Sequence, residues 1–144
     1  MNFFCKILIL FFISLFISCS DDSGDNLPLT IAPNNVEGIL INGTWKITSY
    51  MDDDKNETND YTGYIFTFMT DKTVNVSGGR SSSGFWNTFK DDKIVKFNLN
   101  FENQIPLDEL NDDWIIKLLT VRKIELEDVS GGNGSIDKLT FEKN

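Results

Sequence analysis

The 144-residue chain contains no histidine, and its 13 Lys and Arg residues are outnumbered by 22 Asp and Glu, which gives a net charge of −9. Without histidine the chain cannot form a Ser–His triad, and it lacks the commonest general base and transition-metal ligand. The excess negative charge repels phosphate backbones, so we expect no binding to nucleic acid. Carboxylates alone can catalyse reactions, but this composition favours a protein that is not an enzyme.

The chain also lacks an apolar run long enough to cross a membrane as a helix, which takes about 20 residues. Its longest run is residues 7–17, ILILFFISLFI, and Lys6 precedes it. A weakly positive start followed by an apolar stretch of this length is typical of a signal peptide. The run leads into Phe16-Ile17-Ser18-Cys19, in which a small residue stands directly before a cysteine.

This ending resembles the lipobox of bacterial lipoproteins. The resemblance implies that residues 1–18 are removed and that Cys19 becomes a lipid-modified N-terminus anchored in the outer membrane. Each buried CH₂ of an acyl chain contributes about 0.8 kcal/mol, so two or three chains make a stable anchor. Cys5 leaves with the signal peptide and Cys19 is acylated, so we expect no disulfide, thiolate metal site or cysteine nucleophile. An uncleaved anchor helix or an ordinary secretory signal is the alternative.

Residues 19–35 have the composition of a flexible acidic tether. The stretch from Ser20 to Asn35 reads SDDSGDNLPLTIAPNN, and it has too little apolar surface to order itself. Asp21-Asp22 resembles the signal that sends lipoproteins of the Bacteroidetes to the cell surface, although acidic linkers also serve solubility alone. We therefore predict an extracytoplasmic domain over residues 36–144. Asp21-Asp22 favours the outer face of the membrane as its location.

Most of the remaining chain alternates apolar and polar residues with period two, which indicates β-strands. In the strand at 93–101, Val95, Phe97, Leu99 and Phe101 alternate with polar residues, as in a sheet with one buried face. In the first strand, Trp45, Ile47 and Met51 should share one face, with Tyr50 on the other. Eight strands are predicted: 41–52, 61–70, 73–77, 83–90, 93–101, 113–119, 123–129 and 138–143. A single helical turn is predicted at 106–110, before the sixth strand, where Pro106 suits the first position.

Eight strands joined mostly by short turns predict an all-β fold, an antiparallel up-and-down barrel. Closing the sheet removes the unpaired edges that an open sheet presents. The first strand, 41–52, should therefore pair with the last, 138–143. A two-sheet sandwich has the same strand count and stays open as an alternative.

Gly43-Thr44-Trp45 on the first strand resembles the Gly-x-Trp motif that opens the lipocalin barrel, where the tryptophan packs across the closed base. With the lipobox, the acidic tether and the later DDWIIKLL and KLTFEK strands, the chain resembles the lipocalin-like lipoproteins of the Bacteroidetes over residues 39–144. It lacks the disulfides and the C-terminal helix of lipocalins. The resemblance therefore implies the barrel more firmly than it implies ligand transport.

A set of aromatic side chains is expected to point into the barrel. They could line a pocket for a small apolar ligand or fill the interior as a core. A domain of this size needs several such rings for stability alone, since each removes about 150–250 Å² from water, and a packed core is the favoured interpretation. The set is Trp45, Phe66, Phe68, Trp86, Phe97, Phe101 and Trp114.

Two groups of carboxylates invite other interpretations. Asp52, Asp54 and Asn56 match the first half of a calcium loop, but Glu57 and Gly63 occupy positions that need glycine and glutamate. The pairs Asp108-Glu109 and Asp112-Asp113 resemble glycosidase carboxylates, but nothing in the sequence places a second pair opposite them. We predict a solvated loop at 52–60, no metal site, no catalytic site and no cofactor.

Two functions from different classes remain. The first is a membrane-anchored barrel that binds a small apolar ligand, which the fold resemblance favours slightly. The second is a filled barrel that acts as an interaction module for a protein or polymer of the cell envelope. A cavity of roughly 300 Å³ or more would favour the first, and a solid interior the second. The sequence identifies neither a ligand nor an oligomeric state.

Overall fold

The computed structural model describes residues 26–129, 132 and 134–144, so the predicted signal peptide, Cys19 and Asp21-Asp22 lie outside the described residues. Its elements are α1 (Pro33–Leu40), β1 (Trp45–Asp52), β2 (Lys55–Asn56), the 3₁₀ helix η1 (Thr58–Tyr61), β3 (Ile65–Phe68), β4 (Thr73–Ser77), β5 (Ser82–Asp91), β6 (Ile94–Asn100), the 3₁₀ helix η2 (Leu107–Leu110), β7 (Asp112–Leu119), β8 (Lys123–Val129) and β9 (Ile136–Lys143). Among the described residues, no helix is long and apolar enough to span a bilayer.

The strands form one closed antiparallel barrel, as the sequence predicts. Apart from the two-residue β2, which pairs with the end of β1, the strands follow one another in chain order from β1 to β9. The barrel closes where β1 pairs with β9, from Trp45 opposite Lys143 to Met51 opposite Lys138. The predicted pairing of the first and last strands is therefore confirmed. The predicted turn at 106–110 is also confirmed, as η2.

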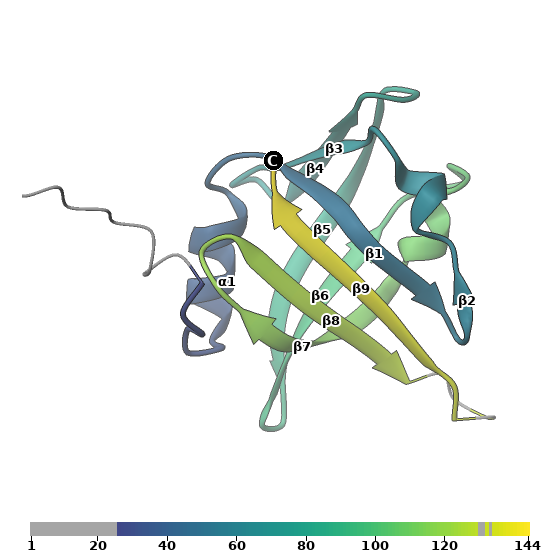
Figure 1. The fold of residues 1–144 in the computed structure, drawn as a ribbon. Helices are drawn as coiled ribbons and strands as arrows, with labels where there is room; N and C mark the ends of the chain where they lie inside the picture. Colours follow the sequence, from purple (N-terminus) through teal and green to yellow (C-terminus); the bar gives the residue numbers. More distant parts are fainter. Residues whose placement is uncertain (1–25, 130–131, 133) are drawn as a thin grey trace, which may run out of the picture.

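The two ends of the barrel differ, and Figure 1 shows them on opposite sides of the molecule. At one end, here called the base, lie the turns that follow β3, β5 and β7, and α1 packs there against β5. At the other, here called the distal end, η1 and η2 lie near the turn that follows β4. Antiparallel neighbours place successive turns at alternating ends, so the strand order dictates this division.

Three of the predicted strands are too long, and the strand predicted over 93–101 only slightly, since β6 spans Ile94–Asn100. The first begins at Trp45 and not at Ile41, because α1 runs to Leu40 and Gly43 adopts a φ of +95° in the turn. The second, predicted over 61–70, is reduced to Ile65–Phe68, because Thr58–Tyr61 coils into η1. The period-two pattern of Tyr61–Tyr64 is real in the sequence, but the buried Tyr61 ring draws this segment over the barrel end.

The predicted faces of β1 are wrong beyond Thr48. The pairing with β9 shifts register between Ile47 and Ser49, so one extra residue is inserted in the strand. Such a bulge moves every later side chain to the opposite face. Tyr50 is consequently buried and Met51 only half-buried, the reverse of the prediction.

Helix α1 is absent from the sequence prediction. Its first turn, Pro33–Asn35, lies in the range assigned to the tether, so the ordered domain begins before Val36. Pro33 suits the first helical turn, and Val36 and Leu40, four residues apart, bury their side chains on one face. Farther upstream, the Leu29 amide donates to the Leu119 carbonyl at 2.7 Å and fixes the incoming chain at the base.

Candidate functional site

All seven aromatic residues of the predicted set are buried, each with no more than 1% of its surface exposed. Five of them form two groups of contacting rings, Phe66 with Phe101, and Phe68 with Trp86 and Phe97. Phe141 on β9 joins the two groups into one cluster, because its ring centroid is 5.2 Å from Phe66 and 5.9 Å from Phe68. Phe141 does not belong to the predicted set, although its alternation with Leu139 in the sequence indicates an inward face.

Phe68 lies at the centre of this cluster. Its ring centroid is 5.6 Å from Trp86, 5.7 Å from Phe97 and 5.9 Å from Phe141, with edge-to-face geometry in each pair. Edge-to-face pairs at 4.5–7 Å contribute about 0.5–1.5 kcal/mol beyond their burial. The rings therefore stabilise one another and occupy the space in which a ligand would otherwise lie.

Each of the three tryptophans donates its indole N–H, the only polar group of its side chain, to a backbone carbonyl of the fold. The Trp45 indole N–H donates to the Leu40 carbonyl at 2.9 Å, and that of Trp114 donates to the Leu110 carbonyl at 2.9 Å. Trp86 donates to the carbonyls of Met69 at 3.1 Å and Thr73 at 3.0 Å. A tryptophan that served a ligand pocket would be expected to offer its N–H to the interior. Here each N–H joins a strand to a neighbouring turn or helix.

The base is sealed by α1. Val36 and Leu40 are fully buried against the core, and Trp45 lies beneath the end of the helix. On the helix surface, one Glu37 oxygen accepts a hydrogen bond from Thr88 Oγ1 at 2.8 Å and lies 2.5 Å from Lys72 Nζ. The hydrogen bond from Lys72 holds the pKa of the Glu37 carboxyl below its usual range, and the Thr88 hydroxyl adds to the effect. This carboxylate joins α1 to both β5 and the β3–β4 turn.

We expect Glu37→Gln to reduce stability in a pH-dependent way. Because the folded protein lowers the pKa of Glu37, its charged form stabilises the fold above the unfolded pKa of about 4.3, and this stability is lost as the pH falls through the folded pKa. Urea denaturation should show a loss of about 1 kcal/mol at pH 7, since the pair is partly exposed, and the loss should shrink in acid. Glu102→Gln, at an exposed loop position, is the control and should behave as wild type at both pH values. An equal loss at pH 7 and pH 3 would contradict the argument.

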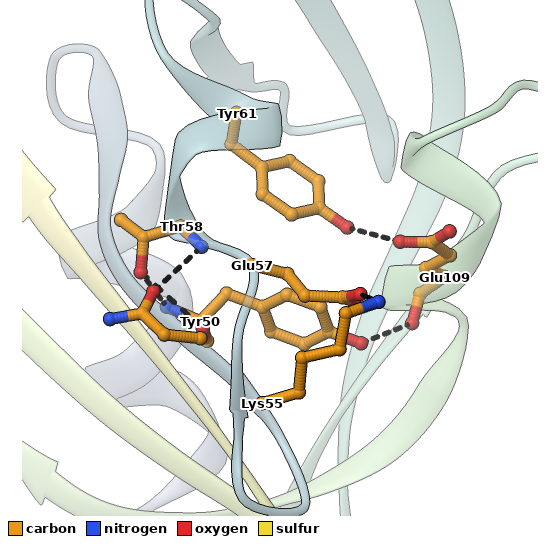
Figure 2. Close-up of polar contacts among 7 residues, drawn as sticks. Tyr50, Lys55, Glu57, Thr58, Tyr61 and Glu109 are labelled. Atoms are coloured by element: carbon orange, nitrogen blue, oxygen red, sulfur yellow. Dashed lines mark hydrogen bonds and ion pairs between the residues drawn. The ribbon is translucent and has the colours of Figure 1, made fainter.

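The distal end is closed by η1 and η2, and two tyrosines, one from η1 and one from β1, bond to the η2 segment (Figure 2). Tyr61 of η1 donates its hydroxyl to the Pro106 carbonyl at 3.0 Å, and Glu109 Oε2 lies 3.4 Å from the same hydroxyl. Tyr50 of β1 donates to the Glu109 carbonyl at 3.1 Å. Leu107 and Leu110 of η2 point into the core and are buried. The acidic loop predicted at 52–60 thus ends in a lid, because η1 folds over the barrel.

Burial and nearby negative charge raise the pKa values of the groups that join η1, η2 and β1 at the distal end, here called the cap. Burial raises the pKa of the Tyr61 hydroxyl and the Tyr50 hydroxyl well above the usual value, and nearby carboxylates add to the shift. Burial also raises the pKa of Glu109, with a further contribution from the Glu57 carboxylate. Glu57 itself forms an ion pair with Lys55 (Figure 2). Both tyrosines are therefore neutral donors at physiological pH, which suits a structural clasp.

We expect Tyr61→Phe to destabilise the domain by about 1 kcal/mol, because the substitution removes the hydroxyl donor and leaves the Pro106 carbonyl with only the Glu109 amide at 3.2 Å. The readouts are urea denaturation and amide hydrogen exchange, in which the amide of Asn111, which directly follows η2 and donates to the Asp108 carbonyl, should lose protection. Tyr64→Phe is a matched control, because the Tyr64 hydroxyl makes no hydrogen bond to another described residue. Unchanged exchange in the Tyr61 variant would show that the cap does not depend on this bond.

Five hollows of about 200–420 Å³ open at the surface of the described part of the chain. None of the seven aromatic residues lines any of these five. Within residues 26–129, 132 and 134–144, no group of three or more Asp, Glu, His or Cys side chains is placed to hold a metal ion. The structure thus brings the predicted aromatic residues together as a packed interior.

The fold is similar to one solved structure in particular. A DUF4847 family protein from Bacteroides vulgatus superposes with a TM-score of 0.52 at 19% sequence identity, over 76% of this chain and 97% of that chain. At this identity the likeness shows a shared fold. No family model matches the sequence, and neither does any curated protein.

Proposed function

We propose that this chain is a lipid-anchored extracytoplasmic lipoprotein whose lipocalin-like barrel is an interaction module of the cell envelope, not a carrier. The observation that supports this choice most strongly is the sealed and filled interior. Each of the seven predicted aromatic residues exposes no more than 1% of its surface. Both ends of the barrel are covered. A ligand could enter only by displacing rings that contact one another.

The anchoring part of the proposal rests on the sequence. The apolar run at 7–17 and Ser18-Cys19 support cleavage before Cys19 and acylation of its thiol. Six residues, Ser20–Asp25, then separate Cys19 from the first described residue, Asn26, a chain length that reaches at most about 25 Å. Because the chain enters the barrel at the base, where Leu29 bonds Leu119, the base would face the membrane. The distal end would be presented to the surroundings.

The barrel surface offers apolar groups to a partner. Ile105, in the loop before η2, is 86% exposed, and Phe85, on the outer wall of β5, is 59% exposed. Exposed apolar residues are ordinary when scattered, whereas apolar surface rimmed by polar residues is common where proteins meet, and Ile105 lies beside a hollow with such a rim. With the interior occupied, recognition would take place on this outer surface.

The test compares the interior with the exterior. The mature chain released from its native envelope should carry no stoichiometric apolar passenger in native mass spectrometry. Its tryptophan fluorescence should also stay unchanged when fatty acids or aromatic dyes are added, since the three tryptophans are buried in the core. A bound passenger, or a saturable fluorescence change that Phe97→Ala abolishes in a folded protein, would instead support a carrier of small apolar molecules.

A further inference from the structure

We propose that the distal end carries a recognition site for a carboxylate joined to an apolar group, with Arg80 as the anion partner. This inference rests on the proposed function, since it names what the module would recognise. The site is a hollow of about 200 Å³ between the β4–β5 turn, the start of β3 and the loop before η2. Its lining includes Tyr64, Arg80, Ser82, Gln104, Ile105 and Leu107.

The parts of the hollow are held in place by close backbone packing. A Cβ at Gly78 would lie 1.8 Å from the Gly63 carbonyl oxygen, and one at Gly79 would lie 2.7 Å from Tyr64 Cζ. Only glycine therefore lets the β4–β5 turn rest against Tyr64. This contact fixes the backbone of the neighbouring Arg80 relative to the Tyr64 ring.

Hydrogen bonds attach the remaining wall. The Gln104 side-chain amide donates to the Ser83 carbonyl at 3.1 Å, which ties the loop before η2 to the start of β5. Ser82 Oγ donates to the Arg80 carbonyl at 3.3 Å within the turn. Three segments that are distant in the sequence thus form one preformed hollow, and a ligand would not have to order them.

Within the part of the chain that the structure describes, the Arg80 guanidinium has no acidic partner. The chain carries 22 acidic and 13 basic residues, yet within the described residues Arg80 forms no ion pair. Lys55, also at the distal end, is already paired with Glu57. A guanidinium stays charged at any physiological pH and presents donors that match the two oxygens of a carboxylate. An incoming carboxylate would therefore find a partner that the fold has not used.

The other residues that line the hollow indicate that the ligand carries an apolar group beside its carboxylate. Ile105 is 86% exposed beside the hollow, the half-buried Tyr64 ring forms a wall, and the buried Leu107 lies beneath. Covering Ile105 would remove apolar surface from water, which favours a ligand with an apolar group next to its charge. A hollow of this volume holds one such group, either of a small organic acid or of an acidic segment of a partner protein.

The test uses the arginine Nε–Hε signals of the lipid-free Cys19→Ser chain from residue 19, which keeps the whole barrel and contains only two arginines, Arg80 and Arg122. Phenylacetate should shift the Arg80 signal saturably and leave the Arg122 signal in place, whereas neutral phenylacetamide should shift neither. A second pair of probes, acetyl-Leu-Glu-amide and acetyl-Leu-Gln-amide, tells whether the natural carboxylate belongs to a partner protein or to a small organic acid. Tighter binding of the Glu peptide supports a partner protein, and binding of phenylacetate alone supports a small acid.

Variants complete the test. Arg80→Gln should weaken binding of the carboxylate probe about tenfold, and Ile105→Ser should weaken it while keeping the charge. Arg122→Gln removes the other arginine, at the base, and is the matched control that should bind as wild type. Equal shifts of both arginine signals, an equal effect of phenylacetamide, or no saturable shift with any probe would overturn the proposal. The indole signals of the three buried tryptophans report separately on a ligand in the interior, so failure of the filled-barrel proposal is seen independently.

Discussion

Phe68→Ala should destabilise the barrel by about 3–5 kcal/mol, as truncations of large buried rings do when the neighbours cannot close the gap. The Phe68 ring is buried and contacts Trp86, Phe97 and Phe141, which lie on three further strands. Because these neighbours are themselves fixed by strand pairing, the vacated volume should persist. Urea denaturation followed by tryptophan fluorescence measures the loss, and the slope of the transition should stay unchanged.

Phe85→Ala is the matched control, because Phe85 lies on β5 but is 59% exposed on the outer wall. Its truncation should cost about 0.5 kcal/mol or less. A folded Phe68→Ala domain should also bind benzene or xenon, since an apolar cavity of this kind stays dry and accepts small apolar guests. A loss below about 1 kcal/mol for Phe68→Ala would mean that the ring lines a space already open, which would favour a ligand pocket over a packed core.

Cys19→Ser should abolish lipidation of the chain, because a hydroxyl cannot supply the thiol that carries the lipid. Wild type expressed with a palmitate analogue should yield a labelled protein whose N-terminus is Cys19. The variant should carry no label and should keep residues 1–18, because the cut depends on the modified cysteine. Mass spectrometry of the N-terminal peptide measures both effects.

Cys5→Ser is the control for this experiment, since Cys5 lies within the segment that is expected to be removed. It should be labelled and cleaved as wild type is. Label that persists in Cys19→Ser, or disappears in Cys5→Ser, would place the lipid elsewhere. A cleaved and unlabelled wild-type protein would point to an ordinary secretory signal. The anchoring proposal and the filled-barrel proposal are thus tested by separate variants.

Local sequence patterns predict much of the barrel. Alternation such as Val95, Phe97 and Leu99 sets one buried face for each strand, and short polar turns make consecutive strands neighbours. The burial of the seven aromatic residues was predictable for the same reason, since an inward face depends only on the parity of a position along its strand. Closure was predicted because pairing the first strand with the last removes unpaired edges, but the strand count also fitted a two-sheet sandwich, and the pairing of β1 with β9 decides between them.

The tertiary structure decided how the ends are sealed and what the surface offers. Tyr50 points inward only because a bulge shifts β1 against β9, and no local pattern in β1 marks it. The clasp at the distal end joins Tyr61 to Pro106, 45 residues away, and Tyr50 to Glu109, 59 residues away. Arg80 likewise meets Tyr64 and Ile105 only in the folded chain. Period and turn chemistry are properties of neighbouring residues, whereas end caps and hollows depend on contacts between distant segments, and only the closed barrel brings those together.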